Sequence, residues 1–242
     1  GKLDTDLAFG RDDLLLKTVE DVAYRRGLGD EIAEGSKRLS ERYELPEVAM
    51  QVKGLEFPAY DPRGMQGQGL LYATSNRGAC HLRGNMLGPE LLGAPIMLDR
   101  HAPSGKAGIL IVIQHTSTVI DSIGMCKFVN FAIGDDFFAR LMTSITGVKY
   151  ETQDLQLAGE RIWNLERLYN LRAGFTEEDD NLPPRFLNEP LQEGGSAGHV
   201  VHLDEMLEEY YRFRGWSADG IPSEKKLAAL GLAELEMEQE NA

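Results

Sequence analysis

Hydrophobic positions along this chain recur mainly at the spacing of an α-helix. Apolar side chains three and four residues apart form a stripe along residues 15–23, and the same period returns in residues 137–145, 155–171 and 206–213. Glycines such as Gly147 and Gly174 follow these runs, as is usual where helices end. The pattern predicts a mainly α-helical chain, folded as an irregular helical bundle.

The first helices are expected to form an αα-hairpin in residues 11–43. Asp12 or Asp13 stands where it could cap the first helix, and Asp30 where it could cap the second. Gly27 interrupts the apolar period between them, in the way that glycine ends a helix. Charged residues occupy the outer faces, so the hairpin is interpreted as structural.

A short extended segment is expected after this hairpin. Apolar residues alternate with polar or small ones from Val48 to Phe57, which is typical of a strand. Pro58 then begins a turn-rich link. We therefore predict two units, a helical hairpin in residues 1–50 and a helical domain in residues 51–242.

The apolar run from Ile109 to Ile120 fits two kinds of element. Its β-branched residues favour a strand, but the run continues through Gln114 and His115 and is longer than a typical buried strand. Periodicity alone does not separate a buried helix from a buried strand. Both interpretations stay open on the pattern itself, and either leads directly into the polar residues after Ile120.

Charge and composition disfavour several classes of partner. The 242 residues carry 25 basic and 39 acidic side chains, a net charge of −14. No basic face for nucleic acid or an anionic membrane is therefore expected. No apolar run reaches the ~20 residues of a membrane span, and no signal peptide is recognised. With only two cysteines, Cys80 and Cys126, a reducing, cytoplasmic location is expected.

Two short stretches concentrate the reactive side chains. The first, Thr74-Ser75-Asn76-Arg77-Gly78-Ala79-Cys80-His81-Leu82-Arg83-Gly84, holds two guanidiniums, an imidazole and a thiol. Small residues let a ligand approach the backbone, and arginine suits phosphate because its planar fork donates paired hydrogen bonds. The second, Asp121-Ser122-Ile123-Gly124-Met125-Cys126-Lys127-Phe128, places a carboxylate, a thiol and an ammonium within seven residues. Such a concentration predicts a site.

Taken singly, most of these residues also have a structural explanation. Cys80 and His81 are adjacent and lack an evident orienting partner, so a nucleophilic cysteine is not favoured. Two cysteines do not make a zinc site, which needs four ligands. Asp121 alone fits a helix end better than a catalytic base, and His115 fits a core or pocket-edge position. The aromatic residues near the C-terminus are expected in the core: Tyr210, Tyr211, Phe213 and Trp216.

In combination, the two stretches resemble the aldehyde:ferredoxin oxidoreductase family. Ala23-Tyr24-Arg25-Arg26-Gly27-Leu28-Gly29-Asp30 is similar to the helical middle domain of that family, and Tyr60-Asp61-Pro62-Arg63-Gly64 to the start of its last domain. The resemblance spans nearly the whole chain. It implies a tungsten enzyme with a bis-pterin cofactor and one 4Fe–4S cluster. Because the middle and last domains of the family are largely helical, it also favours a helix for the run from Ile109.

The resemblance assigns roles to the second stretch. It places Asp121 and Lys127, with Gly124 and Met125 between them, against a pterin, and it makes Cys126 the last ligand of the cluster. A carboxylate can accept hydrogen bonds from pterin N–H groups, and thiolates are the standard iron–sulfur ligands. Met125 stands where the family has leucine, a change of similar volume.

The first stretch lies beside the metal in this family. By resemblance His81 is a proton donor or acceptor there, which suits a side chain that titrates near neutrality. Asn76, Arg77 and Arg83 are expected to line the pterin pocket. His81 is thus the predicted catalytic residue, and the other three are predicted cofactor contacts.

One departure from the family limits what this chain is expected to do alone. The three other cluster cysteines and the N-terminal sheet domain that supports the pterins are missing from it, and a cluster needs four thiolates. The chain also begins at Gly1 directly in an amphipathic pattern. We therefore expect an excised fragment or a subunit of a split enzyme, inactive and without metal by itself.

The complete enzyme is expected to oxidise an aldehyde to a carboxylic acid with a tungsten or molybdenum bis-pterin, and to pass electrons through the 4Fe–4S cluster to ferredoxin. Its expected partners are the missing N-terminal domains or subunit, ferredoxin and the aldehyde, and a homo-oligomer is compatible with the sequence. Two alternatives stay open. One is another substrate known in the family, such as formaldehyde, a sugar-phosphate aldehyde or an aromatic acyl-CoA. The other is a cofactor-free helical interaction module.

Overall fold

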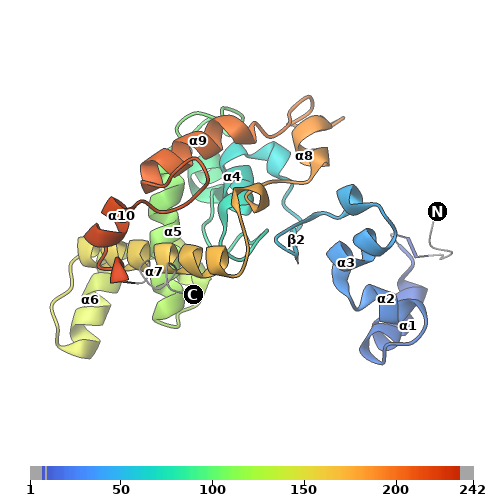
Figure 1. The fold of residues 1–242 in the computed structure, drawn as a ribbon, viewed down its shortest axis with the longest axis horizontal. Helices are drawn as coiled ribbons and strands as arrows, with labels where there is room; N and C mark the ends of the chain where they lie inside the picture. Colours follow the sequence, from blue (N-terminus) through green and yellow to red (C-terminus); the bar gives the residue numbers. More distant parts are fainter. Residues whose placement is uncertain (1–6, 9, 235–242) are drawn as a thin grey trace.

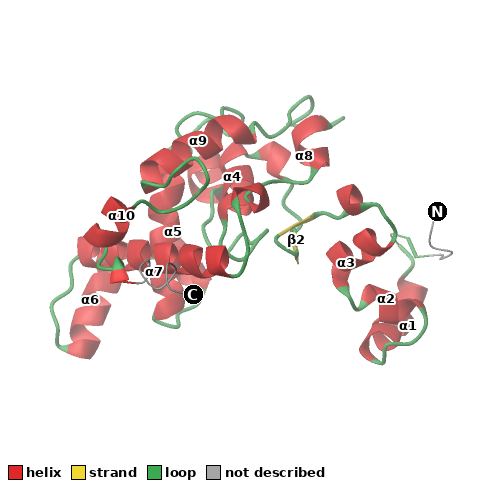
Figure 2. Ribbon diagram, in the orientation of Figure 1, coloured by secondary structure: helices red, strands yellow, loops and turns green. Residues whose placement is uncertain are grey.

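The computed structural model describes residues 7, 8 and 10–234 and confirms a mainly α-helical chain (Figure 1). In chain order its helices are α1 (Asp12–Ala23), α2 (Leu28–Ile32), α3 (Gly35–Arg42), α4 (Gln66–Thr74), α5 (Ala107–Ser122), α6 (Asp135–Thr146), α7 (Thr152–Arg172), α8 (Pro184–Asn188), α9 (Leu203–Arg214) and α10 (Glu224–Ala229). An antiparallel pair of strands, β1 (Gln51–Val52) and β2 (Leu55–Glu56), interrupts them. Figure 2 shows that helices and loops make up nearly all of the described chain.

Helices α1, α2 and α3 form an N-terminal group that lies apart from the remaining helices (Figure 1). The expected two-helix hairpin is wrong in one respect, because its second helix is divided at Gly35, whose φ of +83° a right-handed helix does not allow. Arg11 and Gly27 precede α1 and α2 without a side-chain cap. The aspartates expected as caps lie inside the first turns, where their charge complements the helix dipole: Asp12, Asp13 and Asp30.

The extended segment expected in residues 48–57 folds back on itself as the β1–β2 hairpin. Val52 pairs with Leu55, and Gly54 makes the turn with a φ of +85°. Val52 is also buried in the larger core, so the chain enters the main helical part at this hairpin. The division into units at residue 50 stays a prediction.

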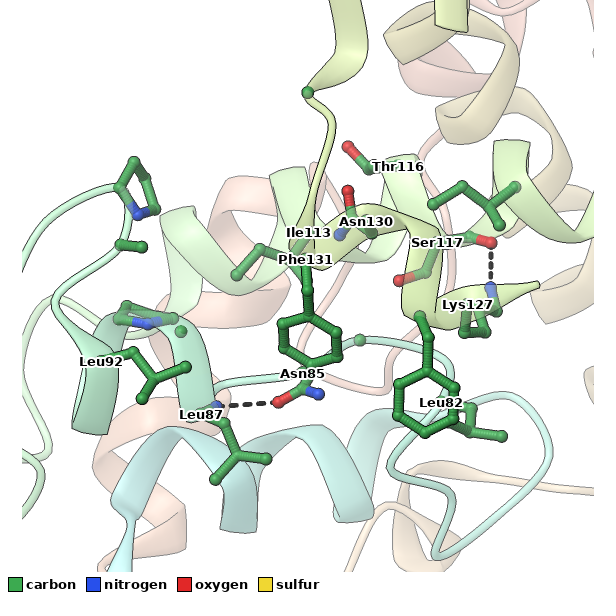
Figure 3. A pocket seen from close by; sticks show the side chains of 18 of the residues that line it. Leu82, Asn85, Leu87, Leu92, Ile113, Thr116, Ser117, Lys127, Asn130 and Phe131 are labelled. Atoms are coloured by element: carbon green, nitrogen blue, oxygen red, sulfur yellow. Dashed lines mark hydrogen bonds between the residues drawn. The ribbon is translucent and has the colours of Figure 1, made fainter. Parts of the chain in front are cut away.

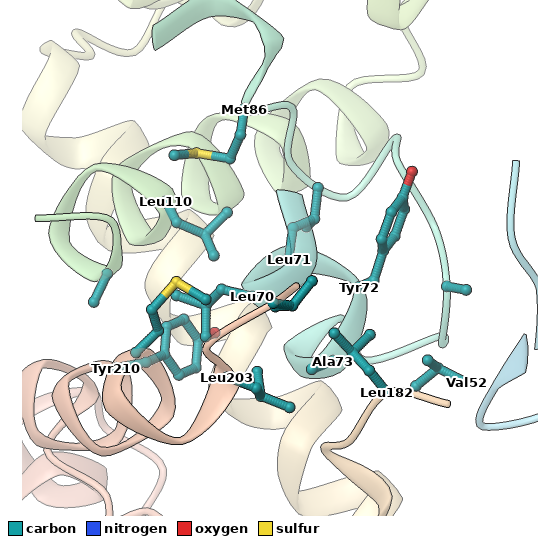
Figure 4. Close-up of a cluster of buried hydrophobic side chains, with 14 of the residues drawn as sticks. Val52, Leu70, Leu71, Tyr72, Ala73, Met86, Leu110, Leu182, Leu203 and Tyr210 are labelled. Carbon is teal, nitrogen blue, oxygen red and sulfur yellow. The ribbon is translucent and has the colours of Figure 1, made fainter. Parts of the chain in front are cut away.

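The larger core lies among α4, α5, α7 and α9 (Figure 4). Helix α4 is buried along its whole length, and Leu70 and Leu110 are fully enclosed. The run from Ile109 is helical, as the resemblance implies, and lies within α5. Helix α5 crosses α7 closely because Gly159 has no side chain: a Cβ there would lie 2.5 Å from the carbonyl oxygen of His115.

The expected helix end at Gly147 is confirmed, and side-chain caps define the starts of two further helices. Gly147 follows α6 in the left-handed conformation, with a φ of +72°. Ser223 caps α10, because its side chain accepts a hydrogen bond from the N–H of Lys226 at 3.2 Å. Helix α7 begins with a capping box between Glu151 and Asp154. Local chemistry therefore sets these boundaries.

The aromatic residues near the C-terminus are mostly in the core, as expected. Tyr210, Tyr211 and Trp216 are buried, whereas the expectation is wrong for Phe213, which is 51% exposed. Residues 210, 211 and 214 form the inward side of α9, and residue 213 lies beside it. His115 is in the core, where its Nε2 lies 2.7 Å from Nη1 of Arg214.

A sealed charge network, formed by Lys53, Arg167, Asp180 and Tyr211, joins four segments of the chain: the β1–β2 turn, α7, the loop after α7 and α9. The carboxylate of Asp180 receives Lys53 at 2.8 Å, Arg167 at 2.9 Å and the Tyr211 hydroxyl at 2.6 Å. The Asp180 side chain is 1% exposed. Burial lowers the pKa of Lys53, and the charge of Asp180 opposes that effect. Charges this deeply buried are tolerated because each has a partner.

Candidate functional site

The two reactive stretches of the sequence lie next to each other in the fold. The first is the loop at residues 75–84, which follows α4. The second begins at the C-terminal end of α5 and enters a 3₁₀-helix, Lys127–Phe131. Between α5 and this 3₁₀-helix, Gly124 turns the chain with a φ of +73°. Arg83 of the loop thereby reaches Asp121 of α5, with Nη1 at 2.8 Å from Oδ2.

Alternating charges extend from this contact in both directions. Lys127 pairs with the same Asp121 oxygen, Oδ2, at 2.9 Å. On the other side, Arg83 pairs through Nη2 with Glu166 of α7, and Asn76 donates to the same Glu166 oxygen at 3.1 Å. We call these five residues the site charge network. It joins α5, α7, the loop and the 3₁₀-helix.

Arg83 is the buried centre of the site charge network. Its side chain is 6% exposed, and its guanidinium carbon lies 5.2 Å from the ring centroid of Trp163. Nη2 also lies 3.4 Å from the Thr118 hydroxyl. Stacking and paired hydrogen bonds together hold the planar group in one orientation, which a lysine could not reproduce.

Asp121 keeps part of its carboxylate available. Both cations contact Oδ2, and no described residue donates to Oδ1. The side chain is 35% exposed. A carboxylate oxygen in this state can accept an N–H hydrogen bond from a ligand, while the paired cations hold the group in one orientation.

Lys127 is paired within the protein. Burial lowers its pKa, Asp121 opposes that effect, and the nearby charges of Arg83 and Arg77 lower it further. The ammonium also donates to the carbonyl oxygen of Ser117 (Figure 3). Lys127 therefore neutralises Asp121 and fixes the start of the 3₁₀-helix to α5.

His81 lies in the loop beside this network. Burial and the charge of Arg77 lower its pKa below the usual value. Its ring centroid is 5.4 Å from that of Tyr60. Burial and the charge of Arg77 both favour the neutral imidazole, which can accept a proton.

A pocket of about 670 Å³ opens beside the site charge network (Figure 3). Its walls come from residues 81–95, the outer face of α5 and residues 127–135. His81 and Lys127 belong to the lining. The rest of the wall is mostly hydrocarbon and includes Leu87, Leu92, Val112, Ile113 and Phe131.

One further charge of the pocket wall is already hydrogen-bonded. Asp135, at the first turn of α6, accepts from the Thr116 hydroxyl at 2.9 Å and from the Gln156 amide at 2.6 Å. Among the described residues that line the pocket, Lys127 is the one lysine or arginine, and it is paired with Asp121. The pocket thus offers a mostly hydrocarbon surface with polar groups that include His81, Lys127 and Asp135.

The two cysteines have different surroundings. Cys80 is buried, and its sulfur accepts from Nε of Arg77 at 3.1 Å and from the N–H of Leu82 at 3.3 Å. Cys126 is exposed and directly precedes Lys127. Across residues 7, 8 and 10–234, no three His, Cys, Asp or Glu side chains are grouped to hold a metal ion. Cys126 therefore offers a single free thiol.

The fold unites some of the residues expected at the site and separates others. Arg83, Asp121 and Lys127 are in direct contact, and Asn76 joins them through Glu166. Arg77 is exposed and bonded to Cys80 instead. The roles of these residues as cofactor contacts stay predictions.

Two residues of the second stretch support the turn. Gly124 supplies its left-handed conformation. Met125 packs against the smaller core that contains Ile120 and Phe138. A volume-conserving apolar residue at position 125 suits that core contact.

Sequence reasoning missed Glu166. It lies 83 residues after Arg83, inside a long amphipathic helix whose other charged residues look the same. Helical spacing predicts that the residue is on a helix, but not which loop the helix faces. No local signal could have identified it.

Comparison with solved structures defines the class of fold. The chain superimposes on the active site complex BamBC of benzoyl coenzyme A reductase in complex with 1,5 dienoyl-CoA with a TM-score of 0.70. The match covers 97% of this chain and 41% of that chain, at 17% sequence identity. At this identity the likeness shows a shared helical fold.

Sequence comparison then shows the family. Residues 1–232 match the model described as aldehyde ferredoxin oxidoreductase, domains 2 & 3, and the chain belongs to this family of oxidoreductases. It is 49% identical to the tungsten-containing aldehyde ferredoxin oxidoreductase of Pyrococcus furiosus and 48% identical to that of Thermococcus kodakarensis. Each match covers 93% of this chain and 38% of the relative. The membership expected from the two stretches is confirmed.

A more distant relative is named for a different activity. The aliphatic sulfonate oxidoreductase, WOR-like subunit, of Pyrococcus furiosus is 25% identical over 96% of this chain and 37% of that protein. The chain thus spans well under half the length of the relatives it matches. In the parts of the chain that the structure describes, no helix is long and apolar enough to cross a membrane.

Proposed function

We propose that this chain provides one side of the cofactor pocket of an enzyme that oxidises an aldehyde to a carboxylic acid and passes the electrons through a 4Fe–4S cluster to ferredoxin. The observation that carries the proposal is the site charge network beside a mostly hydrocarbon pocket that Lys127 also lines, together with the exposed thiol of Cys126. The chain spans 38% of its relatives, so further domains or a subunit complete the enzyme.

The donor set fits one edge of a pterin. Oδ1 of Asp121 is free to accept from the amino and ring N–H groups of a pterin, and Arg83 and Lys127 hold the carboxylate in place. Arg77, exposed on the same loop, suits the pterin phosphate. Asn76 and the Gly124 turn complete the contact. These residues would hold a tungsten or molybdenum bis-pterin from one side only.

The cluster fits this chain in part. Thiolates are its usual ligands, and Cys126 is exposed next to the network, whereas the buried sulfur of Cys80 is hydrogen-bonded to its own loop. Cys126 would therefore supply one ligand and the completing domains the other three. Iron content is the direct measure of this assignment.

The oxidation converts an aldehyde and a water molecule into a carboxylate, three protons and two electrons. When bound, the metal–pterin group supplies the two-electron acceptor. The residues of this chain handle the protons and the substrate. His81, neutral because burial and Arg77 lower its pKa, accepts a proton as water adds to the carbonyl carbon. The pocket holds the hydrocarbon part of the aldehyde away from water.

The pocket favours an uncharged aldehyde over the charged substrates known in this family. A phosphate or a coenzyme A ester would need unpaired cations. Lys127 is paired with Asp121, and Arg83 lies between Asp121 and Glu166. The walls offer hydrocarbon instead. We therefore propose an aldehyde with an apolar side chain as the substrate class.

The test uses the complete protein, produced with tungstate and assayed for iron, pterin and aldehyde-dependent reduction of ferredoxin. Cys126→Ser is expected to lower iron content several-fold, and Cys80→Ser serves as the matched control that keeps its iron. Unchanged iron in Cys126→Ser would favour the cofactor-free interaction module. A wild-type protein without iron and pterin would overturn the proposed function.

A further inference from the structure

Glu166 belongs to the site although neither reactive stretch contains it. It lies on α7, and its Oε2 receives both Nη2 of Arg83 and the amide of Asn76, the latter at 3.1 Å. Asn76 is further held through Nδ2 to the carbonyl oxygen of Trp163, at 3.2 Å. Oε2 of Glu166 therefore accepts hydrogen bonds from residues near both ends of the loop, 76 and 83, and holds them against α7.

The geometry gives Glu166 a specific task. Arg83 is shared between two carboxylates, Asp121 on Nη1 and Glu166 on Nη2. Because the guanidinium is planar, fixing Nη2 also fixes the direction in which Nη1 points. That direction determines which Asp121 oxygen is occupied. With Nη1 and Lys127 both on Oδ2, Oδ1 is left free.

Exposure separates this arrangement from an ion pair that only stabilises the fold. In the sealed charge network, Asp180 and Arg167 are each 1% exposed. At the site, Arg83 is 6% exposed, but Asp121 and Glu166 are 35% and 36% exposed. The cation is enclosed and both carboxylates border open space. Such an arrangement is suited to presenting acceptors to a ligand.

We propose that Glu166 is a positioning residue for the pterin: it orients Arg83 and Asn76 so that Asp121 presents Oδ1 to the cofactor. The proposal rests on the proposed function, in which Asp121 contacts a pterin. At metal sites, loss of a residue that orients a metal ligand commonly lowers metal affinity or activity by about ten- to a hundredfold, and an effect of similar size on pterin retention is expected here. Glu166 itself needs no contact with the cofactor.

The test compares Glu166→Gln with Glu160→Gln in the complete protein. Glu160 lies on the same helix, is 24% exposed and pairs with Lys226 at 2.6 Å, so it controls for loss of an α7 ion pair. Pterin per chain, measured by fluorescence of the oxidised pterin released on denaturation, is expected to fall about tenfold in Glu166→Gln and to stay at the wild-type level in Glu160→Gln. Thermal unfolding of the cofactor-free proteins is expected to shift equally little in both.

Glu166→Asp keeps the charge on a shorter arm and is expected to recover pterin relative to Glu166→Gln. If Glu166→Gln does not fold, the Asp variant carries the test, and its pterin content is then expected between wild type and zero. Wild-type pterin content in Glu166→Gln overturns this inference alone. A wild-type protein that holds no pterin overturns the proposed function as well.

Discussion

Two carboxylates of this chain are each paired with two cations, yet they lie in opposite surroundings. The Asp180 side chain is 1% exposed. It forms ion pairs with Lys53 and Arg167 and accepts a hydrogen bond from the Tyr211 hydroxyl. Asp121 is 35% exposed, and Arg83 and Lys127 meet on one of its oxygens. The sealed carboxylate uses its acceptors within the fold. The partly open one keeps Oδ1 without a donor among the described residues.

The difference shows why an ion pair alone does not mark a site. In the sealed charge network, desolvated charges must be matched within the protein, since an unpaired buried charge is very costly. In the site charge network, water screens the exposed carboxylates and the pairs add little stability. These pairs then serve mainly to orient the charged side chains. The comparison is testable because stability and ligand retention should respond to different residues.

The largest effect on stability is expected from Asp180→Ala. Removing this carboxylate leaves the ammonium of Lys53 and the guanidinium of Arg167 buried without their partner, which costs about 3–5 kcal/mol. Urea unfolding followed by circular dichroism measures the change in the free energy of unfolding. A loss below about 1 kcal/mol would show that water reaches this network and that the sealed description is wrong.

The next largest effect on stability is expected on lowering the pH, because His115 is buried. Burial, and then the charge of Arg214, lowers the pKa of His115 to about 3. An unfolded histidine has a pKa of about 6.5 and therefore binds a proton first as the pH falls. The neutral imidazole therefore contributes stability that is fully present above about pH 6.5 and is lost as the pH falls toward 3. Between pH 7 and pH 4 the free energy of unfolding should fall by an amount on the order of 3 kcal/mol.

His115→Gln is the variant that isolates this effect. Glutamine does not titrate, so the difference in unfolding free energy between the two proteins should shrink as the pH falls from 7 to 4. Parallel curves over that range would mean that another group causes the acid loss.

An intermediate effect, on substrate choice rather than stability, is expected from Phe131→Ala. Phe131 lines the pocket and is 57% exposed, so its removal widens the cavity at little cost to the fold. In the complete protein, the ratio of kcat/KM for a bulky aromatic aldehyde to that for acetaldehyde should rise about tenfold. Phe137→Ala, exposed on α6 and outside the pocket lining, should leave the ratio unchanged.

The smallest effect on stability is expected from Asp121→Asn. Its ion pairs are partly exposed, so the free energy of unfolding should change by about 1 kcal/mol or less. Pterin retention in the complete protein should nevertheless fall, because an amide presents a donor beside the cations and holds them less well. A stability loss as large as that of Asp180→Ala would remove the distinction between the two networks.

Much of the fold could be predicted from local patterns. Helical periodicity identified α6, α7 and α9, and Gly147 marked the end of α6 correctly. The run in α5 needed more than periodicity, because its β-branched residues favour a strand. Resemblance to a helical family settled it correctly. Phe213 was misplaced because the apolar pattern of α9 does not show how wide a face the neighbouring helices cover.

The candidate site was predictable to the extent that it lies in contiguous stretches. Asp121, Cys126 and Lys127 are close in the sequence, and their chemistry was visible there. That Arg83 reaches Asp121 depends on how the loop after α4 packs against α5. The position of Glu166 beside Arg83 depends on the close crossing of α5 and α7, which Gly159 allows.

The sequence by itself therefore determines the helical elements, their ends and the residue types available for chemistry, because these depend on neighbours a few positions apart. The pairing of carboxylates with cations, and which of those pairs is sealed, comes from tertiary packing. Long-range packing sets the distance between groups and the amount of water around them, and both control the strength of an electrostatic interaction. For this reason Asp121 and Asp180 look alike along the chain and differ in the folded protein.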